Sequence, residues 1–341
     1  AVSATTPVAI IGADCRLPGA PDLDAYWRLL VEGREGLGPL PLERYGADYA
    51  ARMAAAPFPQ RGGFLEDVAR FDADFFALSP VEALRLDPQH RLFLETAWGA
   101  LESAGLRPAD LPRETGVFAG VSGMDYAELL RAHGIEADAH TATGNSHAML
   151  TNRLSFLLDL HGPSEAIDTA CSSSLVAVTR AVEAIRSGRC LAAFAGGVNL
   201  ALSLESFLGP HQAGMLSPEG RCKTFDCEAD GYVRGEGAGV VLLKPLEAAL
   251  RDGDPVLGVI AGAAENHGGR AGSLTAPNTL AQAEVIVRAM AGIDPATVAC
   301  VEAHGTGTRL GDPVEVEALK LAYSRLTETA HPPLPPGSVA L

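Results

Sequence analysis

The sequence predicts a layered α/β protein in which most strands of the sheet are parallel. Short apolar segments rich in β-branched residues, such as 8–12 and 115–120, alternate with longer segments whose apolar residues recur at helical spacing. This alternation is typical of α/β proteins with parallel sheets. The segments 165–174 and 299–308 also share one pattern, an apolar strand followed by a turn of small polar residues. That repetition is compatible with a fold made of two similar halves.

The predicted elements begin with a strand at 8–12, which ends at a glycine, and a helix at 23–31. The region 45–63 has no clear period and is predicted as a loop with one helical turn. A long helix begins at Asp87-Pro88 and stops at Gly105. The remaining strands are predicted at 115–120, 165–169, 194–202, 240–243, 256–260 and 298–303. The remaining helices are predicted at 150–160, 172–187, 279–290 and 313–326, with a short helix between the strands 240–243 and 256–260.

Composition and charge narrow the class of function. The chain has 341 residues, 47% of them hydrophobic, which is enough to form a large core or two domains. A net charge of −16 argues against a nucleic-acid partner. The longest uncharged apolar region, 191–204, is shorter than the roughly 20 residues that cross a membrane. We therefore expect neither a nucleic-acid nor a membrane partner.

The six cysteines are scattered, which is typical of reduced thiols in a cytoplasmic enzyme. The first six residues carry no Lys or Arg and no apolar stretch, so no secretion signal is predicted there. Cys222 and Cys227 are the nearest cysteine pair, but no second Cys or His pair accompanies them at zinc spacing. The glycine run 235–239 lacks the GxGxxG spacing and precedes an apolar strand, so it is predicted as a turn. No metal or nucleotide site is therefore predicted.

Cys171 is the strongest candidate for a nucleophile. In the segment 168–175 (DTACSSSL) a predicted strand ends, the chain turns and a helix begins. The unpaired N–H groups and the positive dipole end of a helix N-terminus favour a thiolate over a thiol. The small flanking residues leave room for a substrate carbonyl, and the Cys171 N–H can help to hold an oxyanion. From the residues alone, a buried cysteine that only packs is an equal alternative.

His304 is the second candidate, because it follows a predicted strand in a glycine-rich segment. A neutral imidazole N–H can donate to an oxygen that gains negative charge, and the hydroxyls of Thr306 and Thr308 can orient a substrate. A histidine in such a loop can also be a turn residue without chemical function. His267 and His211 are weaker candidates, and the other histidines are predicted on the surface or in packing.

These segments resemble motifs of a known family. DTACSSSL at 168–175 resembles the nucleophile motif of polyketide ketosynthases, and EAHGTGT at 302–308 with GDPVE at 311–315 resembles their first histidine motif. The likeness continues through 8–19 (VAIIGADCRLPG), 86–91, 214–226 (GMLSPEGRCKTFD) and 231–237 (GYVRGEG), so it covers essentially the whole chain in order. The chain thus resembles the β-ketoacyl synthase domain of modular type I polyketide synthases. The segments 266–269 and 274–278 resemble the trans-acyltransferase branch.

The resemblance implies a thiolase-like fold, in which two similar α/β halves pack as five layers (αβαβα), usually as a homodimer. It implies that Cys171 takes an acyl chain from an acyl carrier protein. A malonyl unit on a second carrier protein is then decarboxylated, and the resulting carbanion attacks the acyl thioester. His304 corresponds to the family's first histidine. The domain itself is expected to bind no cofactor, since its substrates arrive on the phosphopantetheine of acyl carrier protein, and other polyketide synthase domains are further expected partners.

The resemblance also predicts where the halves lie. Residues 1–250 correspond to the N-terminal half with the nucleophile, and 251–341 to the start of the C-terminal half. The family's lysine and second histidine would follow Leu341, so the second half is expected to be incomplete and the chain by itself to aggregate. Glu315, which pairs with that lysine in the family, is expected to have no partner. Residues 327–337 are predicted as a loop and 338–341 as the beginning of a strand.

Two alternatives to a condensing enzyme remain open. A non-condensing or split domain would only transfer acyl groups or dock acyl carrier proteins, but non-elongating members commonly lack the histidine that corresponds to His304. A Cys–His thioester hydrolase would need a residue to orient the histidine, and no Asn or Asp stands at a recognisable spacing.

Overall fold

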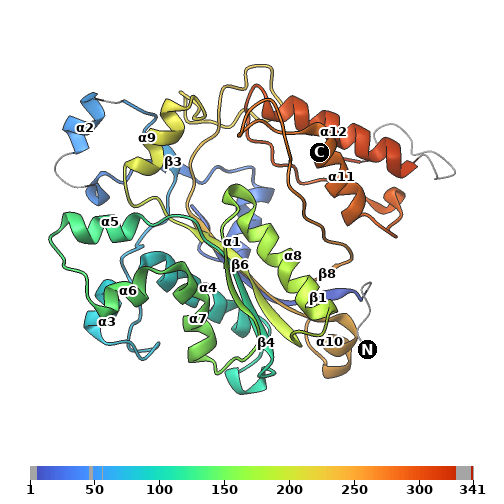
Figure 1. Cartoon of the computed structure of the whole chain (residues 1–341), viewed down its shortest axis with the longest axis horizontal. Helices are drawn as coiled ribbons and strands as arrows, with labels where there is room; N and C mark the ends of the chain where they lie inside the picture. The colour runs from blue at the N-terminus through green and yellow to red at the C-terminus, as the bar shows by residue number, and fades with distance from the viewer. Residues whose placement is uncertain (1–5, 46–48, 56, 328–338, 341) are drawn as a thin grey trace. The chain divides into compact units, whose positions relative to one another are not determined.

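The structure is a computed structural model that describes residues 6–45, 49–55, 57–327 and 339–340 (Figure 1). The chain forms two compact units. The first contains Ala1–Gly209 and Arg234–Ile260, and the second contains Pro210–Val233 and Ala261–Leu341. The family-based boundary near residue 250 divides the chain differently and stays a prediction. None of the described helices is both long and apolar enough to cross a membrane.

A six-stranded mixed sheet with the order β5-β4-β6-β7-β1-β8 forms the centre of the first unit. Its strands are β1 (Val8–Arg16), β4 (Thr115–Gly120), β5 (Ser164–Ile167), β6 (Ala192–Asn199), β7 (Gly237–Pro245) and β8 (Gly258–Ile260). β4 pairs in parallel with β5 and β6, whereas the other three pairings are antiparallel. The prediction of a mostly parallel sheet is therefore wrong, because the long connection between β6 and β7 begins and ends at the same end of the sheet.

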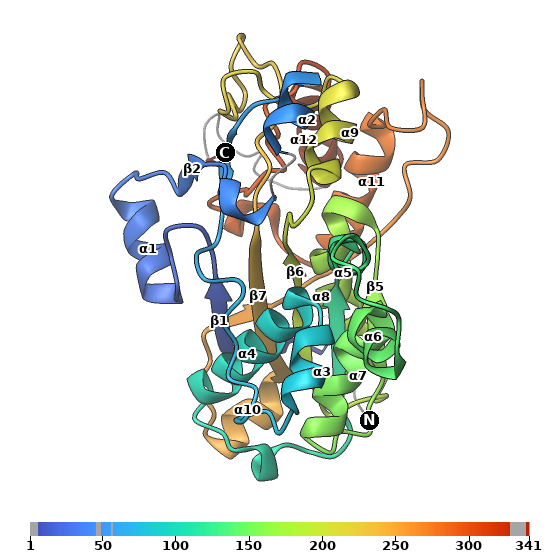
Figure 2. The same cartoon turned by 90° about the vertical axis from the view of Figure 1, so that its left-hand side faces the viewer.

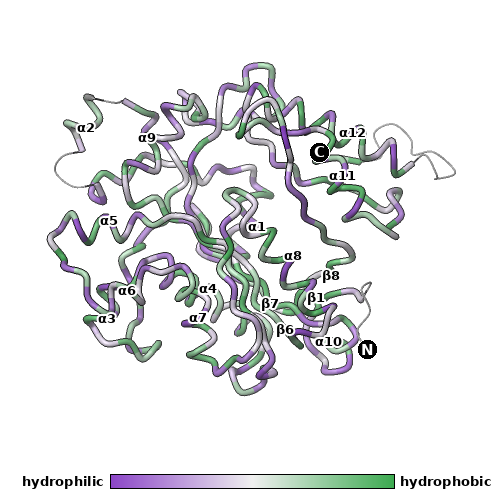
Figure 3. Tube along the Cα trace, in the orientation of Figure 1, coloured by the Kyte–Doolittle hydropathy of each residue, from purple (hydrophilic) through white to green (hydrophobic). Residues whose placement is uncertain are grey.

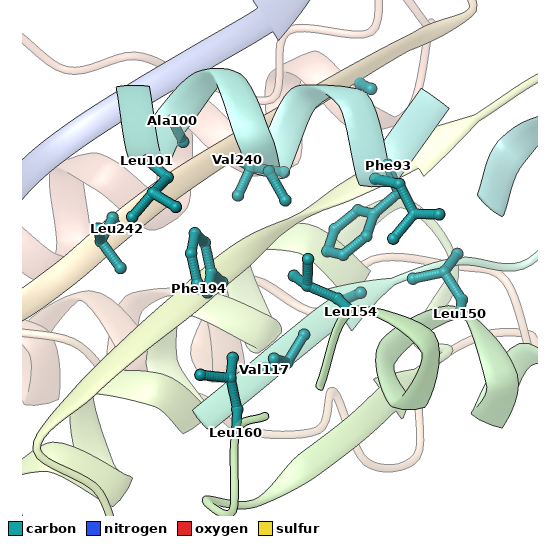
Figure 4. Close-up of a cluster of buried hydrophobic side chains, with 14 of the residues drawn as sticks. Phe93, Ala100, Leu101, Val117, Leu150, Leu154, Leu160, Phe194, Val240 and Leu242 are labelled. Carbon is teal, nitrogen blue, oxygen red and sulfur yellow. The ribbon is translucent and has the colours of Figure 1, made fainter. Parts of the chain in front are cut away.

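Helices cover both faces of this sheet. α4 (Pro88–Ser103) and α7 (His147–Leu157) pack on one face, and α8 (Ser173–Arg186) packs on the other (Figures 1 and 2). Figure 4 shows the core on the first face, where Phe93 and Leu154 lie close to Val117 and Phe194. The strands that supply this core are among the most hydrophobic parts of the trace (Figure 3). Since strand side chains alternate between faces, the same strands present their other residues to α8.

Shorter elements surround this layer. β2 (Leu37–Pro39) and β3 (Arg61–Gly63) form a separate antiparallel pair. The short helices are α1 (Leu23–Val31), α2 (Tyr49–Ala55), α3 (Pro80–Arg85), α5 (Asp125–Ala132), α6 (Ala139–Asn145), α9 (Glu205–Gln212) and α10 (Leu246–Asp252), and the 3₁₀ turns are η1 (Leu42–Arg44) and η2 (Pro108–Asp110). α3, α5, α6 and α9 were not predicted, since six to eight residues are too few to show a helical period.

The ends of α4 follow the predicted chemistry. The Asp87 side chain accepts a hydrogen bond from the Gln89 N–H at 2.8 Å and caps the helix, and Pro88 occupies the first helical position. Gly105, which follows the helix, has a φ of 69°, a left-handed conformation that glycine adopts without strain. The predicted start and stop of this helix are confirmed.

The second unit is helical in its described residues, with α11 (Thr279–Ala289), η4 (Pro295–Thr297) and α12 (Gly311–Thr327). Its described β pairing is limited to the isolated bridges Leu216–Tyr232 and Cys300–Ala340. Within the described residues, the strand predicted at 298–303 is represented by a single bridge, between Cys300 and Ala340, and by no longer ladder. The glycine run predicted as a turn is also corrected, since Gly237–Gly239 belong to β7. Most of the predicted loop at 327–337, together with Ser338 and Leu341, lies outside the described residues.

Glu236 is a buried carboxylate that joins three loops of the first unit. It accepts two hydrogen bonds from Arg44 Nη1, at 2.8 and 2.9 Å. It also accepts from the backbone N–H groups of Leu65 at 2.8 Å and Ala201 at 3.0 Å. Its side chain is 0% exposed. A carboxylate removed from water in this way is stable only while it is paired and hydrogen-bonded.

The substitution Arg44→Met is expected to destabilise the protein by about 3–5 kcal/mol, because it leaves the Glu236 charge buried without its cation. Urea unfolding measures this loss. The matched control is Arg34→Met, which breaks the exposed pair between Arg34 and Glu32 and should change the unfolding free energy by about 1 kcal/mol or less. Equal losses in the two variants would contradict the structural role of the buried pair.

Candidate active site

Cys171 lies in a tight turn between β5 and α8 of the first unit. Ala170–Ser172 form a single 3₁₀ turn, η3, and α8 begins at Ser173. Ala170 has a φ of 55°, in the left-handed region that costs a residue with a Cβ about 1–3 kcal/mol. The Cys171 thiol is exposed. Cys171 thus precedes the helix by two residues, close to the predicted position, on a strained strand-to-helix turn.

Two glycines on neighbouring strands allow α8 to lie directly on the sheet. Gly120 ends β4 and pairs with Gly197 of β6. A Cβ at Gly120 would lie 2.6 Å from the backbone nitrogen of Ser174, and one at Gly197 would lie 2.8 Å from the Ser174 Cβ. A larger residue at either position would displace the start of α8, and Cys171 with it. Sequence reasoning missed both glycines, although a glycine inside a strand often indicates a close backbone approach.

Side chains stabilise the Cys171 turn. Asp168 accepts a hydrogen bond from the Ala170 N–H at 3.0 Å and another from the Ser122 hydroxyl at 3.1 Å. The Ser172 hydroxyl donates to the Thr169 carbonyl at 2.9 Å. These contacts connect the end of β5 to the loop that follows β4. Hydrogen bonds of Asp168 and Ser172 therefore fix the backbone of the turn before α8 begins.

His304 lies in the loop that precedes α12 of the second unit, and it is exposed. The Glu315 carboxylate, in the first turns of α12, accepts hydrogen bonds from the backbone N–H of His304 at 2.6 Å and of Gly305 at 2.9 Å. The expectation that Glu315 has no partner is therefore corrected. The family resemblance predicted a side-chain cation, a lysine, as its partner. Glu315 instead binds two backbone amides and thereby fixes the position of the His304 backbone.

Thr306 and Thr308 form a hydroxyl pair close to His304. Their Oγ1 atoms lie 3.1 Å apart, and Thr308 Oγ1 accepts a hydrogen bond from the Gly311 N–H at 3.1 Å. The pair holds two hydroxyl protons, and the bond between the two residues uses one of them. Whichever residue donates, one hydroxyl proton remains for a ligand.

Asp312 completes the histidine loop and was missed by the sequence reasoning. It is 4% exposed and accepts hydrogen bonds from the N–H groups of Phe225 at 2.7 Å and Gly307 at 3.0 Å. Gly305 has a φ of 51°, and a Cβ there would lie 2.6 Å from the Thr224 side chain. Only glycine fits such a position without rearrangement. The segment around 224 and the histidine loop are thus packed together within the second unit.

The predicted site residues belong to two different units. In the second unit, the loop that carries His304, Thr306 and Thr308 is hydrogen-bonded to Glu315 of α12. Cys171 belongs to the first unit. A cavity of about 700 Å³ in the first unit lies between β1, the segment 65–72 and α4, and Cys171 is not among its lining residues. In the described part of the chain, no three His, Cys, Asp or Glu side chains are grouped as metal ligands.

Comparison with known proteins identifies the family. The family model of the β-ketoacyl synthase N-terminal domain matches residues 5–249, and that of the C-terminal domain matches residues 257–339. The polyketide synthase ThaG of Burkholderia thailandensis is 50% identical over 92% of this chain, which spans 6% of that protein. The polyketide synthase PksN of Bacillus subtilis is 47% identical over 94% of this chain, which again spans 6% of that protein.

Solved structures agree with this result. The oxazolomycin ketosynthase domain OzmH KS7 of Streptomyces albus has a TM-score of 0.86 at 42% identity, over 93% of this chain and 56% of its own. The ketosynthase from module 6 of the bacillaene synthase of Bacillus subtilis has a TM-score of 0.86 at 38% identity, over 93% of this chain and 55% of its own. These neighbours confirm the thiolase-like α/β fold. Assignment to the trans-acyltransferase branch stays a prediction. The chain therefore belongs to the β-ketoacyl synthase family, and the relatives that it matches are polyketide synthases and their ketosynthase domains.

Proposed function

We propose that this chain transfers an acyl group to Cys171 and carries out decarboxylative Claisen condensation with a malonyl-type extender unit on acyl carrier protein. The observation that carries this proposal is the turn at Cys171, where an exposed thiol follows a strained left-handed residue and precedes a helix N-terminus. A helix N-terminus favours negative charge, so the turn suits the oxyanion that forms when the sulfur attacks a carbonyl.

In the first half-reaction, the Cys171 thiolate attacks the carbonyl carbon of an acyl thioester. The new S–C bond forms, the bond to the phosphopantetheine sulfur breaks, and that sulfur leaves as a thiolate and takes up a proton. One thioester is exchanged for another, so the step runs near equilibrium. Covalent attachment divides a difficult transfer into two easier ones.

In the second half-reaction, a malonyl thioester loses CO₂, and the electron pair of the broken C–C bond forms an enolate. Negative charge grows on the thioester oxygen, where a hydrogen-bond donor lowers the barrier. We assign this donation to the imidazole N–H of His304, whose backbone Glu315 holds in place. The enolate carbon then attacks the acyl carbonyl, and the Cys171 thiolate is released. The remaining hydroxyl proton of the Thr306–Thr308 pair can bind the malonyl group or the phosphopantetheine arm.

Partners follow from this chemistry. Both substrates would arrive on the phosphopantetheine of acyl carrier protein, and the domain itself would need no bound cofactor. The relatives named above are polyketide synthases much longer than this chain, so other domains of such a synthase are proposed as partners. Since these substrates are carried by proteins of the same assembly, we propose a cytoplasmic location.

The test uses the protein with an acyl thioester of N-acetylcysteamine, a small analogue of phosphopantetheine. Peptide mapping should locate the acyl adduct on Cys171. Addition of malonyl-loaded acyl carrier protein should release CO₂ and give a β-ketoacyl carrier protein. Loading without CO₂ release would instead identify a non-condensing transfer domain, and release of the free acid without condensation would identify a Cys–His thioester hydrolase.

A homodimer is proposed through the β5 edge of the sheet. β5 is an end strand in the sheet order, so one side of its backbone can pair with another strand. α7 and α8 pack against it and carry large exposed apolar side chains, Phe156 at 84% and Leu175 at 72% exposure. Two copies related by a twofold axis would pair β5 with β5 and cover these side chains, since such an interface is self-complementary.

The substitution Phe156→Glu is therefore expected to raise the dimer dissociation constant by about tenfold or more, because it places a charge in an apolar contact. Analytical ultracentrifugation over a concentration series measures this change. Trp27→Glu is the matched control, since Trp27 is 66% exposed on α1, which packs against β1 rather than β5. A protein that is monomeric before substitution, or equal weakening by both variants, would refute the proposed interface.

A further inference from the structure

The residue before the nucleophile is held in an unfavourable conformation by its neighbours. Ala170 has a φ of 55°, which a residue with a Cβ adopts only when the surrounding structure enforces it. Cys171 follows directly, so the direction of its backbone N–H and of its thiol depends on this one backbone angle. Any group that holds Ala170 in place therefore also aims Cys171.

The Ser173 hydroxyl is such a group. It accepts a hydrogen bond from the Thr169 N–H at 2.8 Å and donates one to the Ala170 carbonyl at 2.7 Å. A hydroxyl has one proton and two lone pairs, so it can do both at once. These two bonds connect the peptide groups before and after the strained turn. An alanine or glycine at position 173 could make neither.

Ser173 itself is firmly placed. It is 6% exposed and is the first residue of α8. A Cβ at Gly120 would lie 2.9 Å from the Ser173 Cβ. The absence of a side chain at Gly120 therefore allows Ser173 to lie against the end of β4. On the opposite side of the turn, Asp168 accepts a hydrogen bond from the Ala170 N–H. Ala170 is thus held at its N–H by Asp168 and at its carbonyl by Ser173.

We propose that Ser173 is a positioning residue for the acylation of Cys171: its hydroxyl keeps Ala170 left-handed and so directs the thiol and the Cys171 N–H toward the acyl carbonyl. The inference rests on the proposed role of Cys171 as the acyl acceptor. Ser173 acts through the backbone and does not contact the substrate. The Ser173→Ala variant should therefore load acyl groups slowly, although its thiol remains present and exposed.

The experiment compares two reagents on the same cysteine. Ser173→Ala should lower the rate constant for acylation of Cys171 by an acyl N-acetylcysteamine thioester about 10- to 100-fold, because attack on a carbonyl requires alignment. Alkylation of Cys171 by iodoacetamide has a weaker geometric requirement and should change by less than about threefold. Peptide mapping follows both reactions at Cys171. Ser174→Ala is the matched control, since Ser174 is exposed and its hydroxyl makes none of the hydrogen bonds of this turn.

A second substitution tests the conformational cause. Glycine adopts a positive φ without strain, so Ala170→Gly combined with Ser173→Ala should recover most of the lost acylation rate. Ser173→Thr retains a hydroxyl and should stay within about tenfold of the original rate, provided thermal unfolding shows that it folds. Equal acylation of the original protein and Ser173→Ala would overturn the inference, as would a loss that Ala170→Gly does not recover. If the original protein forms no adduct at Cys171, the proposed function fails, and the inference fails with it.

Discussion

The Cys171→Ala variant is expected to take up no acyl group at all from an acyl thioester, and to form no condensation product. In the proposed function the thiol is both the nucleophile of the first half-reaction and the leaving group of the second, so its removal should stop both. Alanine is smaller than cysteine and the position is exposed, so the fold should tolerate the change. Intact-protein mass spectrometry after incubation with an acyl thioester measures the result directly as an absent mass increase.

Other thiols provide the control. Cys227 and Cys300 are also exposed, but neither precedes a helix on a strained turn. Cys227→Ala should therefore load one acyl group, as the original protein does. An adduct of full stoichiometry on Cys171→Ala would show that another residue is the acceptor, and the assignment of the nucleophile would have to be abandoned.

The sequence predicted the class of fold better than the arrangement of its strands. Local patterns identified most strands and the long helices, because residues at helical or alternating spacing report burial directly. They did not show that β7 runs antiparallel to β6, since strand direction depends on where a long connection returns. They also missed helices of six to eight residues such as α3 and α6, whose ends are set by caps and tertiary contacts.

The sequence indicated which reactive side chains are candidates for the site. It did not indicate the backbone hydrogen bonds that hold them in place. Cys171 and His304 stand in motifs that indicate chemistry by residue type and order. The hydrogen bonds of Ser173 and Asp312 could not be predicted, because both side chains bind backbone peptide groups. Which peptide groups lie within reach of a side chain depends on the folded backbone and not on residue type. Glu315 was predicted from the family resemblance to pair with a lysine, whereas its partners in the structure are two backbone amides.

The His304→Ala variant is expected to accept an acyl group on Cys171 at nearly the original rate and to lose condensation about 100- to 1,000-fold, because it removes the proposed donor to the developing enolate oxygen. His304 is proposed to act on the enolate of the second half-reaction, so attack of the Cys171 sulfur on an acyl thioester should not require it. Two measurements separate the steps: mass spectrometry for loading, and CO₂ release from malonyl-loaded acyl carrier protein for decarboxylation.

His304→Gln distinguishes hydrogen-bond donation from proton transfer. A glutamine side chain carries an amide N–H donor but is not a base, so it should retain more decarboxylation than alanine if donation is the role of His304. His133→Ala is the control, since His133 is an exposed histidine at the end of α5 and should affect neither step. If loading disappeared in His304→Ala while CO₂ release survived, His304 would be the group that activates the thiol, and the division of work between the two half-reactions would be the reverse of the one proposed.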